Sequence, residues 1–346
     1  MKNDRSMLPH KTRIYLTVDV ETSMGAAWRY SDRQPLPIDK LIFCQKGDIG
    51  YGLPLIVEEL NKYGFRATFF TEVLFSHCLG ADQAQIVVDY LLNNRQDVQL
   101  HIHPVFRHYA LALREGTAEA FRRYRRLSDA LNDYDVETQY AFVSEGADLF
   151  QRFVGERAVA FRAGGFRGDE NTLLALRRLG VLIDSSYSPS VLASFAQHRP
   201  APNITQNING IIEMPLTNAM SGVSWFRGWK PMAISSVSFA ELRSVLGQAH
   251  RTGLESVVLI FHSFSTVKPR DVFYSSFRPD RMVISRFRRL LRYLADHASM
   301  YEVCTMRDAA FNSKRFDAAE TATLELGLLK PLVRKAGQAL DRIYWI

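Results

Sequence analysis

The sequence predicts an α/β fold in which a mainly parallel sheet of about seven strands closes into a distorted (β/α)7 barrel. Short apolar runs alternate with amphipathic stretches, and several of the runs end in polar side chains. Alternating strands and helices favour a parallel sheet, and such barrels carry their function at the carboxyl ends of the strands. The 346 residues, 47% hydrophobic and 23% charged, are ample for one large domain.

The expected strands and helices alternate along most of the chain. Runs rich in Val, Ile, Leu and Phe predict strands, and apolar residues at helical spacing predict helices. Pro54 and Gly64 mark the ends of one helix, and Asn171 and Gly180 mark those of another. The strands are expected over residues 13–19, 66–70, 98–101, 158–162, 181–184, 211–214, 257–261 and 301–304, and the helices over residues 54–63, 82–94, 117–131, 144–154, 172–179, 239–250 and 282–296.

Two stretches fall outside this alternation. Residues 190–238 are rich in Asn, Pro, Ser and Trp and are expected to form an elaborated loop near the mouth of the site. Residues 313–346 are expected to form a helical extension to a barrel domain of residues 1–312. This extension mixes apolar and basic side chains, so it could lie as a peripheral helix on an anionic membrane. A helix packed on the domain or a dimer contact is the alternative, and Pro331 would interrupt a helix there.

Composition argues against several classes of protein. The formal net charge of +7 comes from short basic clusters, which fit an anionic substrate or surface but equally fit solvated helix faces. The three cysteines are widely spaced, so the sequence predicts neither a disulfide framework nor a thiolate zinc site. Nothing resembles a nucleic-acid-binding module. The sequence has no signal-peptide pattern and no apolar run of about 18 residues, so we expect a cytoplasmic protein.

Two pairs of candidate metal ligands stand at the ends of apolar strands. Asp19 and Glu21 end the first predicted strand, and His101 and His103 end a later one. Because side chains alternate between the faces of a strand, the members of each pair would point the same way. Carboxylates and imidazoles together suit a divalent cation, zinc above all, with one carboxylate free to act as general base. The alternatives are that Asp19 or Glu21 caps the next helix or pairs with a buried arginine, and that His103 is a core histidine.

Further candidate residues follow other strands. His262 ends the most hydrophobic strand and could protonate a leaving group, whereas a serine nucleophile is not favoured because no Gly-x-Ser-x-Gly elbow exists. Arg162 could orient the Asp19 carboxylate, or could pair with a carboxylate in a purely structural role. Gly164 and Gly165 would let the backbone approach substrate or metal ligands closely.

Aromatic residues and one more histidine complete the candidates. Trp225 and Trp229 could stack on the apolar face of a sugar ring, or could pack the inside of the long loop. His108 lies beyond Pro104 and is expected at the surface or the rim of the site.

The order of these motifs resembles that of the NodB-like polysaccharide deacetylase superfamily, carbohydrate esterase family 4. The resemblance spans residues 12–312 and implies a distorted barrel that holds a divalent cation and removes N-acetyl groups from amino sugars. It implies that Asp19 is the catalytic base, that His101 is the first histidine of the metal motif, and that Arg162 and His262 are the positioning arginine and the acid. The motifs are Thr-Val-Asp19-Val-Glu21, Gly64-Phe-Arg-Ala-Thr-Phe-Phe70, His101-Ile-His103-Pro104, Phe161-Arg162-Ala-Gly-Gly, Asp184-Ser-Ser186, Glu213-Met-Pro215-Leu and Leu259-Ile-Phe-His262-Ser263.

Two departures from the family pattern concern the metal. Val20 stands where the family has its second aspartate, so the metal carboxylate must be Glu21 or Asp19 itself. Val105 stands where the family has its second histidine, which leaves His103 in that role. Both departures resemble an outlying branch of cytoplasmic enzymes in bacterial surface-polysaccharide or lipopolysaccharide biosynthesis.

The sequence therefore predicts a metal-dependent hydrolase that removes an N-acetyl group from an amino sugar of a bacterial surface polysaccharide or its precursor. Two alternatives stay open. One is the hydrolysis of a cyclic amide or imide on the same scaffold, and the other is a catalytically silent barrel that binds a glycan.

Overall fold

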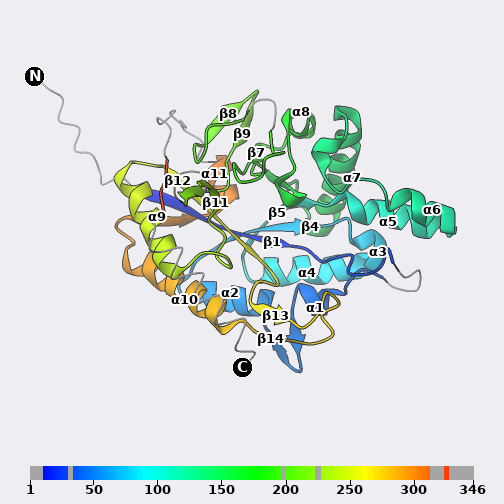
Figure 1. Cartoon of the computed structure of the whole chain (residues 1–346), viewed down its shortest axis with the longest axis horizontal. Helices are drawn as coiled ribbons and strands as arrows, with labels where there is room; N and C mark the ends of the chain where they lie inside the picture. The colour runs from blue at the N-terminus through cyan, green and yellow to red at the C-terminus, as the bar shows by residue number, and fades with distance from the viewer. Residues whose placement is uncertain (1–10, 30–33, 196–198, 223–226, 312–322, 327–346) are drawn as a thin grey trace, which may run out of the picture.

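A curled, mainly parallel sheet forms the centre of the molecule (Figure 1). The computed structural model describes residues 11–29, 34–195, 199–222, 227–311 and 323–326. The strands of the main sheet are β1 (Thr12–Val20), β4 (Thr68–Glu72), β5 (Asp97–Ile102), β6 (Ala160–Ala163), β7 (Ile183–Asp184), β8 (Gln206–Ile208), β9 (Ile211–Glu213), β12 (Ser256–His262) and β15 (Tyr301–Cys304). Three hairpins pair β2 (Gln45–Lys46) with β3 (Ile49–Gly50), β10 (Asn218–Ser221) with β11 (Gly228–Pro231), and β13 (Val267–Pro269) with β14 (Phe277–Pro279).

The main sheet runs in the order β12-β1-β4-β5-β6-β7-β9-β8, and β15 pairs with the first half of β1. All pairings are parallel except that of β8 with β9. Irregular backbone contacts span the gap between β9 and β12. Thr217 N donates to Val258 O at 3.1 Å, and Ile234 N donates to Ile260 O at 2.9 Å. The predicted α/β fold with a distorted barrel is confirmed.

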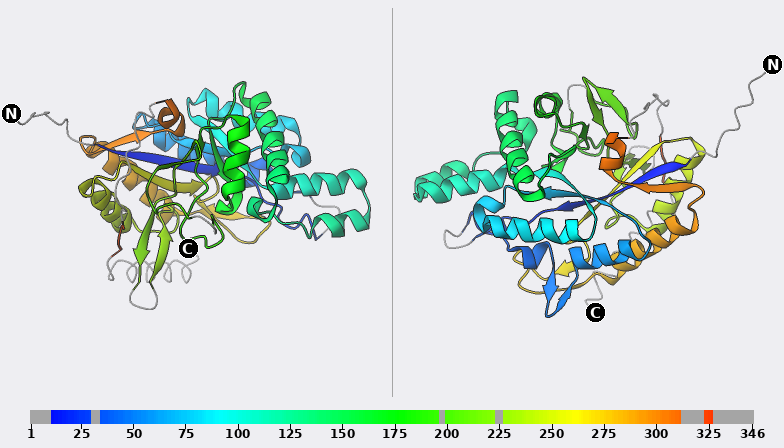
Figure 2. Two further views of the ribbon diagram at one scale, coloured as in Figure 1. Left: turned by 90° about the horizontal axis from the view of Figure 1, so that it is seen from above. Right: turned by 180° about the vertical axis from the view of Figure 1, so that it is seen from behind.

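Helices surround this sheet, most of them on its outer face (Figure 2). They are α1 (Ile38–Leu41), α2 (Leu53–Asn61), α3 (Ser76–Leu79), α4 (Ala81–Asn93), α5 (Pro104–Glu115), α6 (Ala118–Tyr124), α7 (Val136–Val154), α8 (Glu170–Leu179), α9 (Phe239–Arg251), α10 (Arg281–Asp296) and α11 (Met306–Phe311), with the 3-10 turns η1 (Leu131–Asp133) and η2 (Gly164–Phe166). The last helix, α11, packs its buried side chains with the residues inside the barrel.

Strand alternation divides the buried residues into an outer and an inner group. Along β1, Leu16, Val18 and Val20 pack in the large cluster between sheet and helices. Tyr15 belongs to the smaller cluster inside the barrel. Asp19 has the same parity as Tyr15, so its carboxylate points into the barrel interior. The period of the strand therefore directs polar side chains to the inside of the barrel, where the strands end.

Most expected elements overlap those observed, but α1, α3, α5 and α11 were not predicted, and α5 is the longest of these four helices. Helix α5 begins at Pro104, directly after the histidine pair, and His108 on it is buried rather than at the rim. The His108 ring lies 3.0 Å from the Tyr134 hydroxyl, measured from Nε2, and so belongs to the packing of α5. The expected loop over residues 190–238 contains the β10–β11 hairpin and strands β8 and β9.

The expected C-terminal extension lies mostly outside the described residues, so its helical form and membrane contact stay predictions. Its described part, 323–326, returns to the fold: Met220 N donates to Leu324 O at 2.7 Å, and Leu326 N donates to Met220 O at 2.8 Å. Among the helices that the structure describes, none combines the length and apolar character needed to cross a bilayer.

Candidate metal centre

Strand pairing brings the predicted site residues together at one end of the sheet. Asp19 on β1 is paired with His262 on β12, and His101 on β5 is paired with Arg162 on β6. Because these strands are parallel, their carboxyl ends lie at the same edge of the sheet. Residues from four separate parts of the chain therefore converge here.

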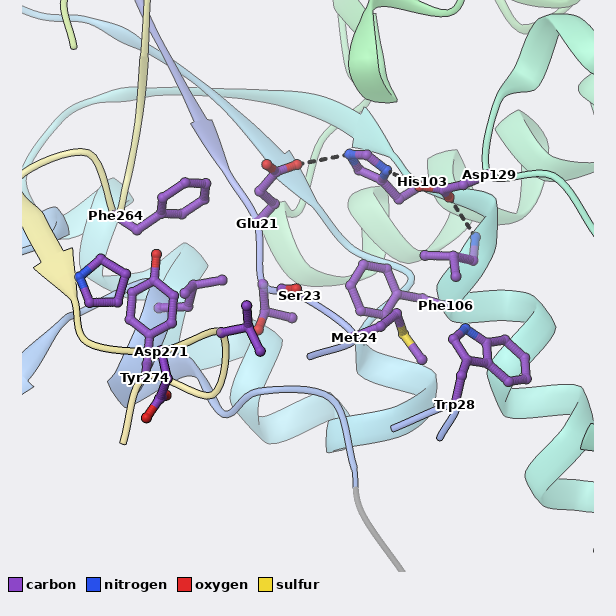
Figure 3. Close-up of a pocket in the computed structure, with 15 residues that line it drawn as sticks. Glu21, Ser23, Met24, Trp28, His103, Phe106, Asp129, Phe264, Asp271 and Tyr274 are labelled. Atoms are coloured by element: carbon purple, nitrogen blue, oxygen red, sulfur yellow. Dashed lines mark hydrogen bonds and ion pairs between the residues drawn. The ribbon is translucent and has the colours of Figure 1, made fainter. Parts of the chain in front are cut away.

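Glu21, His101 and His103 form a group able to hold a metal ion. One ligand atom from each lies within 4.8 Å of the others. Glu21 Oε2 lies 3.2 Å from His101 Nε2 and 2.8 Å from His103 Nε2. One carboxylate and two imidazoles are a donor set that suits zinc and related divalent cations, and three protein ligands leave a position for water or substrate. Figure 3 shows Glu21 and His103 facing each other at the wall of a cavity.

Hydrogen bonds on the far side of each imidazole orient the ligand nitrogens. His101 Nδ1 lies 2.8 Å from the Arg162 carbonyl oxygen, and His103 Nδ1 lies 2.7 Å from Asp129 Oδ2. When Nδ1 donates to these oxygens, the lone pair of a neutral imidazole is at Nε2 and points into the group. Asp129 is itself held, because its Oδ1 accepts a hydrogen bond from Val105 N at 2.8 Å. Both histidines therefore present Nε2 as the ligand atom.

The electrostatics of the group favour a cation. Burial alone would raise the pKa of Glu21, but the charge of His103 and hydrogen bonds from both histidines hold it well below its usual value. Burial alone would lower the pKa of His103, but Asp129 and Glu21 hold it well above its usual value. The negative charge that attracts a proton to His103 also attracts a divalent cation.

Gly164 makes room for the His103 ring. A Cβ atom at Gly164 would lie 2.5 Å from His103 Cε1 and 2.6 Å from Nδ1, which no side chain tolerates without movement. The next residue, Gly165, has a φ of 60°, a left-handed conformation that favours glycine. Gly164 thus lies close to a candidate ligand, and the substrate-binding role expected of both glycines stays a prediction.

Asp19 lies beside this group but is not a member of it. Its Oδ1 accepts a hydrogen bond from Arg162 Nη1 at 2.6 Å, and both side chains are almost completely buried. The Arg162 guanidinium also contacts Thr17 Oγ1 and the carbonyl and hydroxyl of Ser185, and it lies over the Phe70 ring. Arg162 engages one oxygen of the Asp19 carboxylate, and both roles predicted for Asp19, ligand and base, stay predictions.

His262 lies on the other side of Glu21. Its Nε2 is 3.9 Å from Glu21 Oε1, its side chain is 31% exposed, and its ring packs against Phe264 at a centroid distance of 5.2 Å. The imidazole is therefore within reach of a group bound next to Glu21 and remains accessible from solvent.

A cavity of about 700 Å³ opens next to the ligand group. The residues drawn in Figure 3 lie on two sides of Glu21: Phe264, Asp271 and Tyr274 on one, and Met24, Phe106 and Trp28 on the other. Trp28 is held edge-on by Tyr109, with ring centroids 4.9 Å apart. None of the described residues that line this cavity is Lys or Arg. Apart from Glu21 and His103, sequence reasoning did not identify this lining, because most of it comes from loops and the rest from elements that were not predicted.

Of the two tryptophans predicted as stacking platforms, the one that the structure describes does not line this cavity. Trp229 lies on β11, opposite Met220 of β10, and is not part of the cavity lining. Trp225 lies outside the described residues. Asp129, in contrast, was not predicted, and no spacing in the sequence marks it as a partner of His103.

Comparison with known proteins shows similarity only at the level of structure. No family model and no curated protein sequence matches the chain. A candidate polysaccharide deacetylase from Mycobacterium smegmatis superimposes with a TM-score of 0.54 and 15% identity, over 92% of this chain and 96% of its own. An allantoinase superimposes with a TM-score of 0.51 and 11% identity, over 90% of this chain and 93% of its own. A peptidoglycan N-acetylglucosamine deacetylase superimposes with a TM-score of 0.45 and 13% identity, over 89% of this chain and 92% of its own. Over most of its length, the chain therefore has the fold of the polysaccharide deacetylases, as its motifs predicted.

Proposed function

We propose that this protein is a metal-dependent hydrolase that removes an N-acetyl group from an amino sugar of a bacterial surface polysaccharide or its precursor. The observation that carries the proposal is the group of Glu21, His101 and His103, in which hydrogen bonds at Nδ1 orient both imidazoles. A bound divalent cation, zinc in our proposal, supplies Lewis-acid polarisation of the amide carbonyl and a water of lowered pKa.

The remaining residues supply proton transfer and orientation. Asp19 is the general base of the proposal, and Arg162 holds its carboxylate in one orientation. His262 is the general acid that protonates the departing amine, because its ring lies on the open side of Glu21. The base is buried and the acid accessible, and this arrangement separates the two proton transfers in space.

The cavity is large enough to accept more than an acetyl group. Its volume of about 700 Å³ lies within the range of small-molecule sites. Trp28 and Tyr274 offer aromatic faces on opposite sides of Glu21, and such faces suit the apolar face of a sugar ring. In this proposal the sugar occupies the cavity next to the ligand group, and the amide lies against Glu21 and His262.

The proposal is tested by metal analysis of the purified protein, together with acetate release from N-acetylated nucleotide sugars, lipid-linked glycans and free glycan chains. H101A should lose both the metal and acetate release. H77A is the matched control, because His77 pairs with Glu145 away from the ligand group. Full activity of H101A would contradict the assignment.

Hydrolysis of a cyclic amide or imide is the second candidate. The allantoinase superimposes almost as well as the candidate deacetylase, with TM-scores of 0.51 and 0.54. The same residues would serve a ring amide, because the bond to be broken is again a C–N bond next to a carbonyl. Ring opening of hydantoins or succinimides without acetate release from any N-acetyl sugar would favour this candidate. A protein that binds glycans but holds no metal would favour the silent barrel.

A further inference from the structure

Helix α10 presents a strongly basic face to solvent. Its apolar side chains, among them Phe287, Leu290 and Leu294, are buried against the barrel. The exposed positions include Arg281, Arg288, Arg289 and Arg292. These positions recur at helical spacing, so the guanidinium groups follow one side of the helix over about 16 Å.

The arginine face forms one wall of a cavity of about 660 Å³. Figure 1 shows α10 next to α2, and Tyr51 and Leu55 close the cavity from the α2 side. Pro279 and Ser285 also line this cavity. The cavity is separate from the one at the metal centre: Asp271 and Tyr274, before β14, line the metal cavity, whereas Pro279 at the end of β14 lines this one.

The positive charge of this cavity is only partly compensated. Arg288 pairs with Glu59 at 2.8 Å, and Glu59 also pairs with Lys62. Arg289 lies over the Phe239 ring with its guanidinium carbon 4.4 Å from the centroid, which leaves its charge in place. Within the described residues, Arg281 and Arg292 make no ion pair. Glu59 is the single acidic side chain that contacts an arginine of this cavity in the described part of the chain.

We propose that the arginine cavity binds a multivalent phosphate group. Arginine guanidinium groups match phosphate oxygens in forked, charge-assisted hydrogen bonds. Converging arginines in one concave site favour a ligand with several negative charges over a single carboxylate, because like charges at close range otherwise repel one another. The Ser285 hydroxyl, between Arg281 and Arg288 on the same helix, can donate a further hydrogen bond to a phosphate oxygen.

This site is independent of the proposed hydrolase function, since none of its residues lines the metal cavity. The cavity at the metal centre has no described Lys or Arg in its lining, so phosphate recognition there would rest on the cation alone. The basic and the metal-binding chemistry of the molecule are thus divided between two cavities that share no lining residue.

Calorimetric titration of the full chain with sodium tripolyphosphate tests the proposal at low ionic strength. R281Q/R292Q should weaken binding about tenfold, because it removes the two unpaired charges and leaves the Arg288–Glu59 pair intact. The matched control is R122Q/R126Q, which removes the same charge from exposed positions at and after the end of α6. It should change binding less than about twofold. Because phosphate also binds divalent metals, all titrations are repeated in the H101A background.

Vesicles of phosphatidylcholine with and without phosphatidylglycerol distinguish the source of the phosphate. Binding of tripolyphosphate supports a free polyphosphate ligand, and binding to anionic vesicles alone supports a lipid headgroup, provided that R281Q/R292Q weakens it selectively. Equal weakening by the two double variants, or no binding of either probe, would overturn the proposal. The single variants R281Q and R292Q, each expected to weaken binding about threefold, serve if the double variant is unstable.

Discussion

Two carboxylate clusters lie at the carboxyl ends of strands in this barrel, and they have opposite properties. At the metal centre, Glu21 faces two imidazoles and a cavity. Between β7 and β9, Asp184 and Glu213 are paired in register and completely buried. Burial and the neighbouring Asp184 hold the pKa of Glu213 well above its usual value, and burial raises the pKa of Asp184 to about 6. Two adjacent carboxyl groups without a histidine share a proton, whereas a carboxylate with two oriented imidazoles and solvent access attracts a cation.

Matched substitutions at the two clusters should have the largest contrast. Glu21→Gln removes the charged ligand atom, and we expect metal affinity and acetate release to fall by at least about 100-fold. Glu213→Gln makes the same chemical change in the sealed pair and should leave metal stoichiometry unchanged. Metal content by mass spectrometry and acetate release check both variants. Equal metal loss in the two would show that the clusters do not differ as described.

Asp129→Asn tests whether the carboxylate behind His103 contributes to the metal site. The amide keeps the size of the side chain but removes the charge that orients and polarises His103. We expect metal affinity to fall about 10- to 100-fold, because partners behind a ligating histidine contribute on that scale. Asp133→Asn, a nearby exposed carboxylate that pairs with Arg167, is the control. Metal competition with a coloured chelator measures the affinity, and an unchanged value for Asp129→Asn would remove Asp129 from the site.

Gly164→Ala should displace His103 by steric contact alone. The added Cβ would lie 2.5 Å from the imidazole, so either the ring or the η2 backbone must move. We expect about tenfold weaker metal binding and a loss of about 1–3 kcal/mol in the free energy of unfolding. Gly247→Ala on α9 is the control, because there the nearest contact is the flexible end of Arg251 at 3.2 Å. Chelator competition and urea unfolding measure the two effects, and wild-type metal affinity would show that the ring position is not critical.

The two pairs of candidate ligands at strand ends could be predicted from the sequence, because the alternation of side chains along a strand is a local property. It did not separate the roles of Asp19 and Glu21, because strand alternation predicts the same direction for both side chains. Arg162, placed by β6, contacts Asp19, whereas the two histidines contact Glu21. Helix α5 was not predicted, because Pro104 was interpreted only as the residue that follows a strand. Proline is also favoured in the first turn of a helix, where Pro104 lies. Asp129 could not be predicted, since tertiary packing of a loop, and no spacing, places it on His103.

The pH dependence of stability gives the smallest expected difference between the clusters. The pKa values of Asp184 and Glu213 are raised in the folded protein, so the native state holds a proton that the unfolded chain releases. This contribution is fully present below the unfolded carboxyl pKa values of about 4 and is lost as the pH rises through the folded values. The loss amounts to about 1.4 kcal/mol for each unit by which a pKa is raised. In Glu213→Gln the amide donates to Asp184 without taking up a proton. The free energy of unfolding of this variant relative to wild type, measured with urea, should therefore increase from pH 5 to pH 9. Parallel curves for wild type and variant would show that the pair shares no proton.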